Sequence, residues 1–105
     1  MADTMRKTVL GTALSIASRE QLIAWLVANK TGDKRLRALL PAGWRVGDKT
    51  GSGAYGSTND IGILFPPDRA PLLVASYLTA TKASEATRNA ALAEVGRLAA
   101  SVAAK

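Results

Sequence analysis

Residues 44–57 read WRVGDKTGSGAYGS, a strand-like run that leads into a short connection rich in glycine. We predict a strand over 44–52, because turn-forming residues precede it at 41–43 and glycines follow it. A second predicted strand, 59–65, stops at two prolines, and a third covers 72–79. Since the links between these strands are short and contain no helix, they indicate an antiparallel meander.

Helices are predicted on both sides of the three strands. Ser18 and Gln21 have the spacing of a capping box, and Ser84 is a suitable N-cap for the last helix. Asp33 is a candidate cap for a short helix that Pro41 closes. The predicted helices cover residues 3–10, 19–29, 34–40 and 84–104. This order predicts an α+β fold, a three-stranded antiparallel meander with flanking helices, over residues 1–105 without a linker.

The apolar residues of these elements predict which faces form the core. Leu72 to Ala75 are apolar on both sides of their strand, so we expect that strand to be covered on both faces. Trp25 and Trp44 are expected to belong to the core rather than to a ligand platform. The apolar faces of the second and last predicted helices are expected to consist of Leu22, Trp25, Leu26, Leu92, Val95, Leu98 and Val102.

Composition excludes several classes of function. The 105 residues suffice for one domain or part of one, and an apolar content of 48% is ordinary for a globular chain. The absence of cysteine and histidine excludes disulfides, thiolate zinc sites and Ser-His-Asp catalysis within the chain, and we expect no metal or cofactor. The net charge of +6 is spread over scattered lysines and arginines, so no nucleic-acid partner is expected. Neither a membrane-spanning run nor a signal-peptide pattern is present, so no membrane partner is expected.

The candidate binding site lies at Lys49, Thr50 and Gly51. Lys49 supplies a compact positive charge with three donors, and Thr50 adds a short hydroxyl. Gly51 and Gly53 lack the Cβ atoms that would keep a ligand away from the backbone. Such a group of residues favours an anion, most simply a carboxylate. Because side chains alternate along a strand, Lys49 and Thr50 can share one ligand only at an open strand edge.

Two nucleotide-binding motifs are matched only in part, and we reject both. Gly51-x-Gly53-x-x-Gly56 has the glycine spacing of a dinucleotide fingerprint, but a strand is expected after it where that fingerprint needs a helix. Asp48 stands where a P-loop needs glycine. The glycines are therefore interpreted as parts of a hairpin.

Several charged residues lie close to the candidate site in the sequence or in the expected sheet. Asp48, Arg35, Arg37 and Asp60 are candidates for ion pairs near the base of the strand. Tyr55, in the turn beside the glycines, is either a wall of the site or an exposed residue. The sequence does not separate these two possibilities.

The stretch around Lys49-Thr50-Gly51 resembles the C-terminal portion of class A serine β-lactamases. The resemblance is carried by residues 40–53 (LPAGWRVGDKTGSG) and 56–61 (GSTNDI), with support from 18–22 (SREQL) and from 89–96 in the last predicted helix. Lys-Thr-Gly is one of the signature motifs of these enzymes and of penicillin-binding proteins. The resemblance implies that the meander is the C-terminal part of a single β-lactamase-like domain.

The resemblance also implies roles for individual residues. Lys49 and Thr50 are expected to bind the substrate carboxylate, and Gly51 to let the backbone lie close to the drug. The backbone N–H of Ser52 is expected to form one half of the oxyanion hole, which makes it the one catalytic group in the chain. The Ser52 carbonyl is expected to receive the side-chain amide of the substrate.

An arginine that assists the carboxylate is placed differently in different members of the family. Many members carry it on the strand after Lys-Thr-Gly, where this chain has Thr58. Others supply it from the segment before Lys-Thr-Gly, where Arg35 falls. The resemblance therefore implies that Arg35 is the second carboxylate contact, and the alternative for Arg35 is a side chain that faces solvent.

The chain departs from the family in the motifs that it lacks. Ser-x-x-Lys, Ser-Asp-Asn and the glutamate that activates the deacylating water are absent from its 105 residues. We therefore expect the isolated chain to be inactive, and interpret it as a shortened reading frame, an engineered piece or one half of a split enzyme whose partner is the N-terminal part of the same protein. By resemblance, the full-length protein is periplasmic or secreted and hydrolyses a β-lactam substrate. Two alternatives stay open, a fragment of a penicillin-binding protein or D,D-peptidase and a catalytically dead relic.

Overall fold

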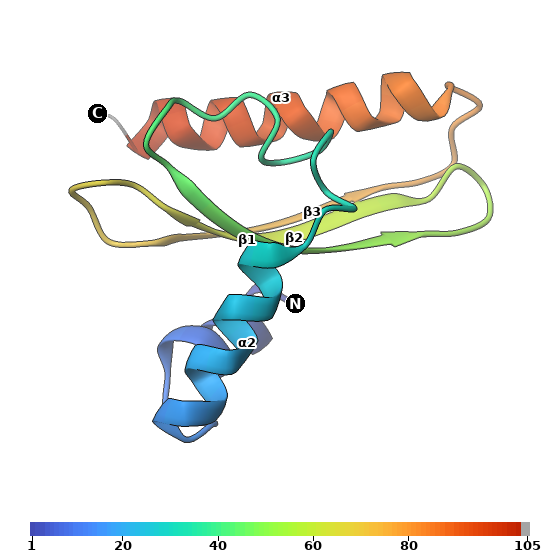
Figure 1. Ribbon diagram of the computed structural model, residues 1–105. Coiled ribbons are helices and arrows are strands. Elements are labelled where there is room, and N and C mark those ends of the chain that lie inside the picture. Colours follow the sequence, from blue (N-terminus) through green and yellow to red (C-terminus); the bar gives the residue numbers. More distant parts are fainter. Residues whose placement is uncertain (104–105) are drawn as a thin grey trace.

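The computed structural model describes residues 1–103, which form a three-stranded sheet between helical layers (Figure 1). In chain order the elements are α1 (Ala2–Met5), the π-helix η1 (Arg6–Leu10), α2 (Ile16–Ala28), β1 (Arg45–Ser52), β2 (Thr58–Phe65), β3 (Leu72–Leu78) and α3 (Glu85–Ala103). Each predicted strand is found to within one residue at either end. The predicted end of the last helix, Ala104, lies outside the described residues.

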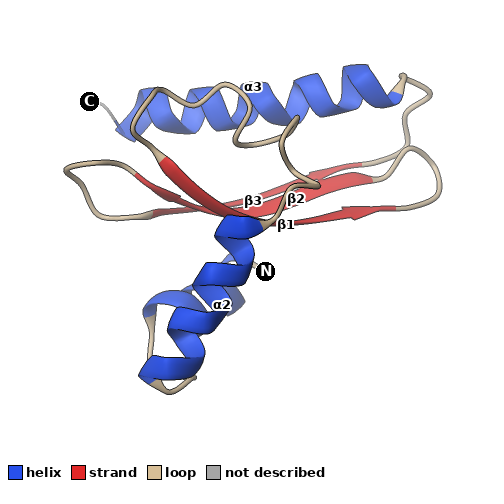
Figure 2. Ribbon diagram, viewed as in Figure 1, coloured by secondary structure: helices blue, strands red, loops and turns tan. Residues whose placement is uncertain are grey.

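The three strands form one antiparallel sheet in the order β1-β2-β3, which confirms the predicted meander. Thr50 of β1 pairs with Asp60 of β2, and Asp60 pairs in turn with Ser76 of β3. Figures 1 and 2 show α3 and the loop 29–44 on one face of the sheet, and α2 with the N-terminal helices on the other. The candidate site residues of β1 therefore lie on a strand at the edge of a central layer.

A tight hairpin joins β1 to β2. Tyr55 and Gly56 both have positive φ angles, 60° and 72°, and the Ser57 N–H donates to the Ala54 carbonyl at 3.1 Å. Two consecutive left-handed residues are what a type I′ turn requires. A Cβ at Gly56 would lie 2.4 Å from the carbonyl oxygen of Thr81, so only glycine fits there. The last glycine of the dinucleotide-like motif, Gly56, therefore lies in a turn between two strands and not before a helix, which agrees with the rejection of that motif.

Two apolar layers hold the sheet in place. Met5, Val9 and Ile63 are almost fully buried on the side of the N-terminal helices, where they form the centre of a cluster with Leu22, Ile23, Leu26, Ile61, Phe65 and Leu73. On the other side, Leu36 is fully buried, and a Cβ on Gly96 would lie 2.1 Å from the Leu36 carbonyl oxygen. The backbone of α3 therefore lies directly against the backbone at Leu36, with no room between them for a side chain at position 96.

The predicted helix over 34–40 is wrong. Residues 31–39, here called the turn segment, form consecutive turns with bonds of the i to i+3 type, such as Arg35 N–H to Gly32 carbonyl at 2.9 Å. The sheet competes for the polar groups of this segment, because the Leu36 N–H donates to the Asp60 carboxyl group at 3.2 Å instead of to a carbonyl one helical turn earlier. The sequence Asp33-to-Leu40 therefore follows the sheet surface and has no α-helix for Asp33 to cap.

The first two helices also differ from the prediction at their ends. α2 begins at Ile16 because the Ser15 hydroxyl caps it, accepting from the Ser18 N–H at 3.2 Å. The predicted capping box at Ser18 is therefore wrong, and Ser18 lies within the first turn of the helix. The first predicted helix is divided into α1 and η1, and η1 ends with a bond of 2.7 Å from the Gly11 N–H to the Arg6 carbonyl.

The N-cap of α3 is confirmed, but the helix buries a different face from the predicted one. The Ser84 hydroxyl accepts from the Thr87 N–H at 3.2 Å. Of the predicted apolar stripe only Leu92 is buried, whereas the other three residues are between 38% and 70% exposed. Because α3 approaches the turn segment so closely, its packed face is made mainly of small side chains. The buried residues are Asn89, Leu92, Ala93, Gly96 and Ala100.

The tryptophans and the third strand are less covered than predicted. Trp25 is 67% exposed, since α2 meets β1 and η1 through one face and presents Trp25 on another, and Trp44 is half-buried. β3 contacts α3 and also α1, and Leu72 to Ala75 are half-buried, so the expected cover on both faces is partial. None of the helices within residues 1–103 is long and apolar enough to cross a membrane.

Candidate functional site

The predicted site lies along the outer edge of β1. Within residues 1–103, β1 pairs with β2 alone, so the edge that carries Lys49 to Ser52 is not covered by another strand. Gly51, Ser52 and Gly53 are exposed, and Thr50 is half-buried. The exposed Lys49 side chain bends along the strand, and its ammonium donates to the Thr50 carbonyl at 2.6 Å. The charge of Lys49 is thereby held at the strand edge, beside Thr50.

Arg35 reaches the same part of β1 from the turn segment. Its side chain is buried, with only 6% of the residue exposed, so the solvent-facing alternative is not observed. One guanidinium nitrogen, Nη2, donates to the Ser52 hydroxyl at 2.9 Å, and Nη1 donates to the Asn59 carbonyl at 2.9 Å and to the Gly51 carbonyl at 3.4 Å. Nε donates to Asn89 Oδ1 of α3 at 2.9 Å. These bonds fix a positive charge directly behind the site strand.

Thr50 is connected to the loop that follows α2. Its hydroxyl oxygen lies 2.7 Å from the hydroxyl oxygen of Thr31. Thr31 in turn bonds to Asn29 Oδ1 through its hydroxyl at 2.9 Å and through its backbone N–H at 3.3 Å. The Asn29 amide nitrogen donates to Asp48 Oδ1 at 3.1 Å. A continuous hydrogen-bonded chain therefore runs from Thr50 to the buried carboxylate two residues earlier in the same strand.

Of the predicted ion pairs near the strand, Arg37 with Asp48 is formed, with Nη2 and Oδ1 2.5 Å apart. The same nitrogen also donates to the Val46 carbonyl at 3.2 Å. Asp60 forms no ion pair among the described residues, so the prediction is wrong for this residue. Its Oδ2 accepts the Leu36 N–H instead, because the fully buried carboxyl faces the backbone of the turn segment.

Asp48 and Asp60 form a buried pair of acidic groups behind the site. The pKa of Asp60 is raised to about 8, first by burial and then by the hydrogen bond to Asp48 and the negative charge of Asp48, against smaller lowering effects of the Leu36 N–H and Arg35. Asp48 Oδ2 and Asp60 Oδ1 have no other hydrogen-bond partner within the described part of the chain. A proton on Asp60 supplies the missing donor between the two carboxyl groups, so Asp60 is protonated at neutral pH.

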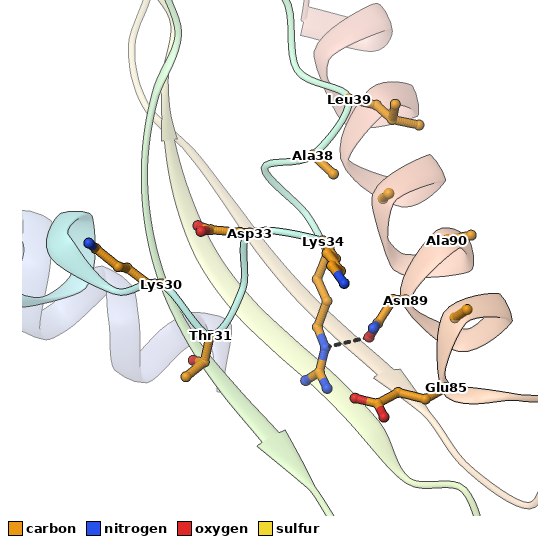
Figure 3. A pocket seen from close by; sticks show the side chains of 12 residues that line it. Lys30, Thr31, Asp33, Lys34, Ala38, Leu39, Glu85, Asn89 and Ala90 are labelled. Atoms are coloured by element: carbon orange, nitrogen blue, oxygen red, sulfur yellow. Dashed lines mark hydrogen bonds between the residues drawn. The ribbon is translucent and has the colours of Figure 1, made fainter.

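A cleft of about 800 Å³ adjoins the strand site between the turn segment and α3 (Figure 3). Arg35 and Asn89 lie on its walls, and Asn89 points from α3 toward the turn segment. The other lining residues are Lys30, Thr31, Asp33, Lys34, Ala38, Leu39, Glu85, Ala86, Ala90 and Ala93. The cleft thus carries three cationic and two acidic side chains, together with Thr31, Asn89 and five apolar residues.

The remaining candidates lie further from the strand edge. Tyr55 is 84% exposed at the tip of the hairpin. Thr58 is buried, donates to the Gly56 carbonyl at 3.2 Å and accepts from Arg88 Nε at 2.9 Å. Among the described residues, no three side chains of the metal-binding types come together.

Sequence reasoning missed Thr31, Asn29 and Asn89 as neighbours of the site. Asn89 and Arg35 are 54 residues apart in the chain, so no local pattern connects them. Asn89 begins the stretch 89–96 that supports the resemblance, but nothing in that stretch indicates a contact with Arg35. These contacts arise from the path of the turn segment, which was itself predicted as a helix.

Fold and site together define an α+β protein whose edge strand carries Lys-Thr-Gly, backed by a buried arginine. The chain belongs to the β-lactamase enzyme family, whose model matches residues 1–103. It is 49% identical to β-lactamase AST-1 of Nocardia asteroides and 47% identical to a β-lactamase of Citrobacter koseri, in each case over 98 residues and 93% of the chain. These matches cover 32% and 33% of the two relatives, so the chain spans about a third of their length.

A solved structure supports the same assignment. An ancestral class A β-lactamase superposes on the chain with a TM-score of 0.95 and 61% sequence identity, covering 97% of this chain and 39% of that one. The comparisons confirm the predicted family and fold class, and the partial coverage is consistent with the expected C-terminal portion.

Proposed function

We propose that this chain takes part in the hydrolysis of β-lactam antibiotics and that β1 supplies the carboxylate-binding wall of the substrate cleft. The observation that carries the proposal is the position of Lys49 and Thr50 on one uncovered strand edge, with the buried Arg35 guanidinium bound directly behind the same strand. The Lys49 ammonium lies at the Thr50 carbonyl, and the Arg35 guanidinium lies at the Gly51 carbonyl and the Ser52 hydroxyl. Two cations and a hydroxyl beside an open backbone suit the carboxylate that β-lactam drugs carry.

Each residue has a role in this proposal. Lys49 attracts the carboxylate as a point charge, Thr50 donates its hydroxyl, and Arg35 adds a second positive charge from behind the strand. Gly51 lets the substrate approach the backbone. The Ser52 N–H stabilises the negative oxygen that develops when the lactam carbonyl is attacked, as one of two oxyanion-hole donors.

The reaction also needs groups that this sequence does not contain. In the family a serine attacks the lactam carbonyl, an acyl-enzyme ester forms, and an activated water hydrolyses it. We propose that the chain is active only together with the family segment that carries Ser-x-x-Lys, Ser-Asp-Asn and the glutamate base, and that the full-length protein works in the periplasm or is secreted. The relatives named above are all β-lactamases, which favours lactam hydrolysis over D,D-peptidase activity.

The carboxylate role of the strand can be tested by binding. Benzylpenicillin is titrated into the ¹⁵N-labelled chain, and the shifts of the backbone amides at positions 49–52 report its affinity. Lys49→Ala is expected to weaken binding at least about tenfold, because it removes a charge-assisted contact. Lys82→Ala, a lysine that is also exposed, is the matched control and should bind like the unchanged chain.

The methyl ester of benzylpenicillin distinguishes recognition of the carboxylate from nonspecific binding of the drug. It lacks the negative charge and should cause little shift at 49–52. Equal affinities of the acid for the unchanged chain and for Lys49→Ala would contradict the proposed role of the strand.

A further inference from the structure

We propose that Thr31 is a positioning residue for the substrate carboxylate and that it acts by donating its hydroxyl proton to Thr50. The inference rests on the proposed function, since it concerns the same strand edge. Thr31 begins the turn segment, and its exposed side chain lies 2.7 Å from Thr50, oxygen to oxygen. This contact joins the loop after α2 to the residue that follows Lys49.

A count of protons defines what this contact can do. A hydroxyl group has one proton to donate and two lone pairs that accept. Thr31 has two acceptors within reach, Asn29 Oδ1 at 2.9 Å and Thr50 Oγ1 at 2.7 Å. It can serve only one of them at a time.

Which of these two acceptors receives the Thr31 proton determines the direction in which the Thr50 hydroxyl proton points. When Thr31 donates to Asn29, the Thr50 proton is directed at Thr31, and the outward side of Thr50 presents only lone pairs. When Thr31 donates to Thr50, the Thr50 proton is free to point outward to an anion. Asn29 Oδ1 stays satisfied in both arrangements, because it also accepts the Thr31 backbone N–H at 3.3 Å.

The base of this hydrogen-bonded chain is firmly held. The Asn29 amide nitrogen donates to Asp48 Oδ1, and the same oxygen is paired with Arg37. Asp48 is fully buried, so Asn29 presents its oxygen to Thr31 in a fixed orientation. When a carboxylate binds beside Thr50, only the hydroxyl protons of Thr31 and Thr50 need to rotate. The carboxylate stabilises the arrangement in which Thr31 donates to Thr50 and Thr50 donates to the ligand.

The substrate carboxylate is thus recognised by the Thr50 hydroxyl, which the Thr31 hydroxyl orients as a donor. Thr31 does not touch the carboxylate in this account. It raises the fraction of Thr50 hydroxyl groups that point outward and polarises that hydroxyl as a donor. Loss of the Thr31 hydroxyl should therefore weaken the binding of the acid and leave the binding of an uncharged ester unchanged.

The test uses the benzylpenicillin titration with variants of Thr31. Thr31→Val keeps the shape and removes the hydroxyl, and it should weaken the affinity for benzylpenicillin about three- to tenfold. Thr31→Ser should restore an affinity within about twofold of the unchanged chain, because it keeps the donor. Thr31→Ala provides the same deletion without the second methyl group, should valine disturb the turn.

A matched control is available in the same chain. Thr79 also forms an exposed hydroxyl pair, 2.8 Å from Ser57, but it lies beyond the end of β3, two strands away from β1. Thr79→Val should leave the affinity for benzylpenicillin unchanged. The amide spectrum outside positions 29–52 verifies that each variant is folded.

The possible outcomes separate this inference from the function on which it rests. Binding that weakens in Thr31→Val and Thr31→Ala but not in Thr31→Ser supports the positioning role. Equal affinities in all Thr31 variants overturn it while leaving the role of Lys49 intact, and so does an equal loss in Thr31→Ser. If the unchanged chain shows no carboxylate-dependent shift, the proposed function fails, and this inference falls with it.

Discussion

At the scale of single residues, the buried carboxyl pair predicts an unusual dependence of stability on pH. The pKa of Asp60 is raised from 3.8 to about 8 in the folded chain. Between these values the folded chain keeps a proton that the unfolded chain has released, so the stabilisation is fully present below pH 4 and is lost as the pH rises to about 8. Stability should fall by roughly 1 kcal/mol per pH unit where this dependence is steepest.

Urea unfolding of the chain and of Asp60→Asn between pH 4 and pH 8 measures this effect. An asparagine can still accept the Leu36 N–H and donate to Asp48, but it does not titrate, so the fall with pH should disappear. Asp68→Asn, at an exposed position after β2, is the control, and its free energy of unfolding should decrease with pH as it does in the unchanged chain. A slope that is the same in Asp60→Asn and in the unchanged chain would show that Asp60 is not its source.

Sequence reasoning located the strand that carries the candidate site but not the contacts that support its residues. Lys49, Thr50 and Gly51 were recognisable because their chemistry is local to a few adjacent residues. The contacts of Arg35 with Ser52 and Asn89 depend on how distant segments pack, and no spacing in the sequence encodes them. Asp60 was misinterpreted as an ion-pair partner because its burial is a property of the assembled sheet.

At the scale of elements, the contact between α3 and the turn segment predicts a strong effect of a small substitution. A Cβ at Gly96 would lie 2.1 Å from the carbonyl oxygen of Leu36, a backbone atom that cannot rotate away. Gly96→Ala should destabilise the chain by about 1–3 kcal/mol despite the higher helix propensity of alanine. The midpoint of thermal unfolding should fall by roughly 4–8 °C for each kcal/mol.

Gly53→Ala is the matched control for this prediction. Its added Cβ would come no closer than 3.9 Å to any residue beyond its two chain neighbours, so the midpoint should change little. If Gly96→Ala unfolds at the same or a higher temperature than the unchanged chain, α3 is not packed on the turn segment as described. Circular dichroism of the two variants decides between these outcomes.

The elements themselves were predicted unevenly, and the reasons are physical. The strands were found because prolines and glycines mark their ends, and α3 because Ser84 caps it. The helix expected over 34–40 failed because tertiary bonds from Leu36 and from the two arginines replace the helical pattern. The apolar stripe of α3 failed because Gly96 and the alanines, not the larger residues, meet the rest of the chain.

At the scale of the whole molecule, large apolar side chains face outward on both helical layers. On α2, Ile16 and Trp25 are 68% and 67% exposed, and on α3, Leu98 and Val102 are 51% and 70% exposed. A single chain of this size has little apolar core to spare. These surfaces fit the proposal that the chain works together with a further part of the family sequence, and the sequence alone could not reveal them because it predicted three of these residues as buried.

The most direct test of the central claim is the rate of hydrolysis of a chromogenic cephalosporin. The purified chain is measured alone and after mixing with the N-terminal portion of a class A β-lactamase, which carries Ser-x-x-Lys, Ser-Asp-Asn and the glutamate base. The chain alone should show no turnover, and the mixture should become active, with a rate that falls when Lys49→Ala replaces the unchanged chain. Turnover by the purified chain alone that falls with Lys49→Ala, or an inert mixture of two folded parts, would contradict the account.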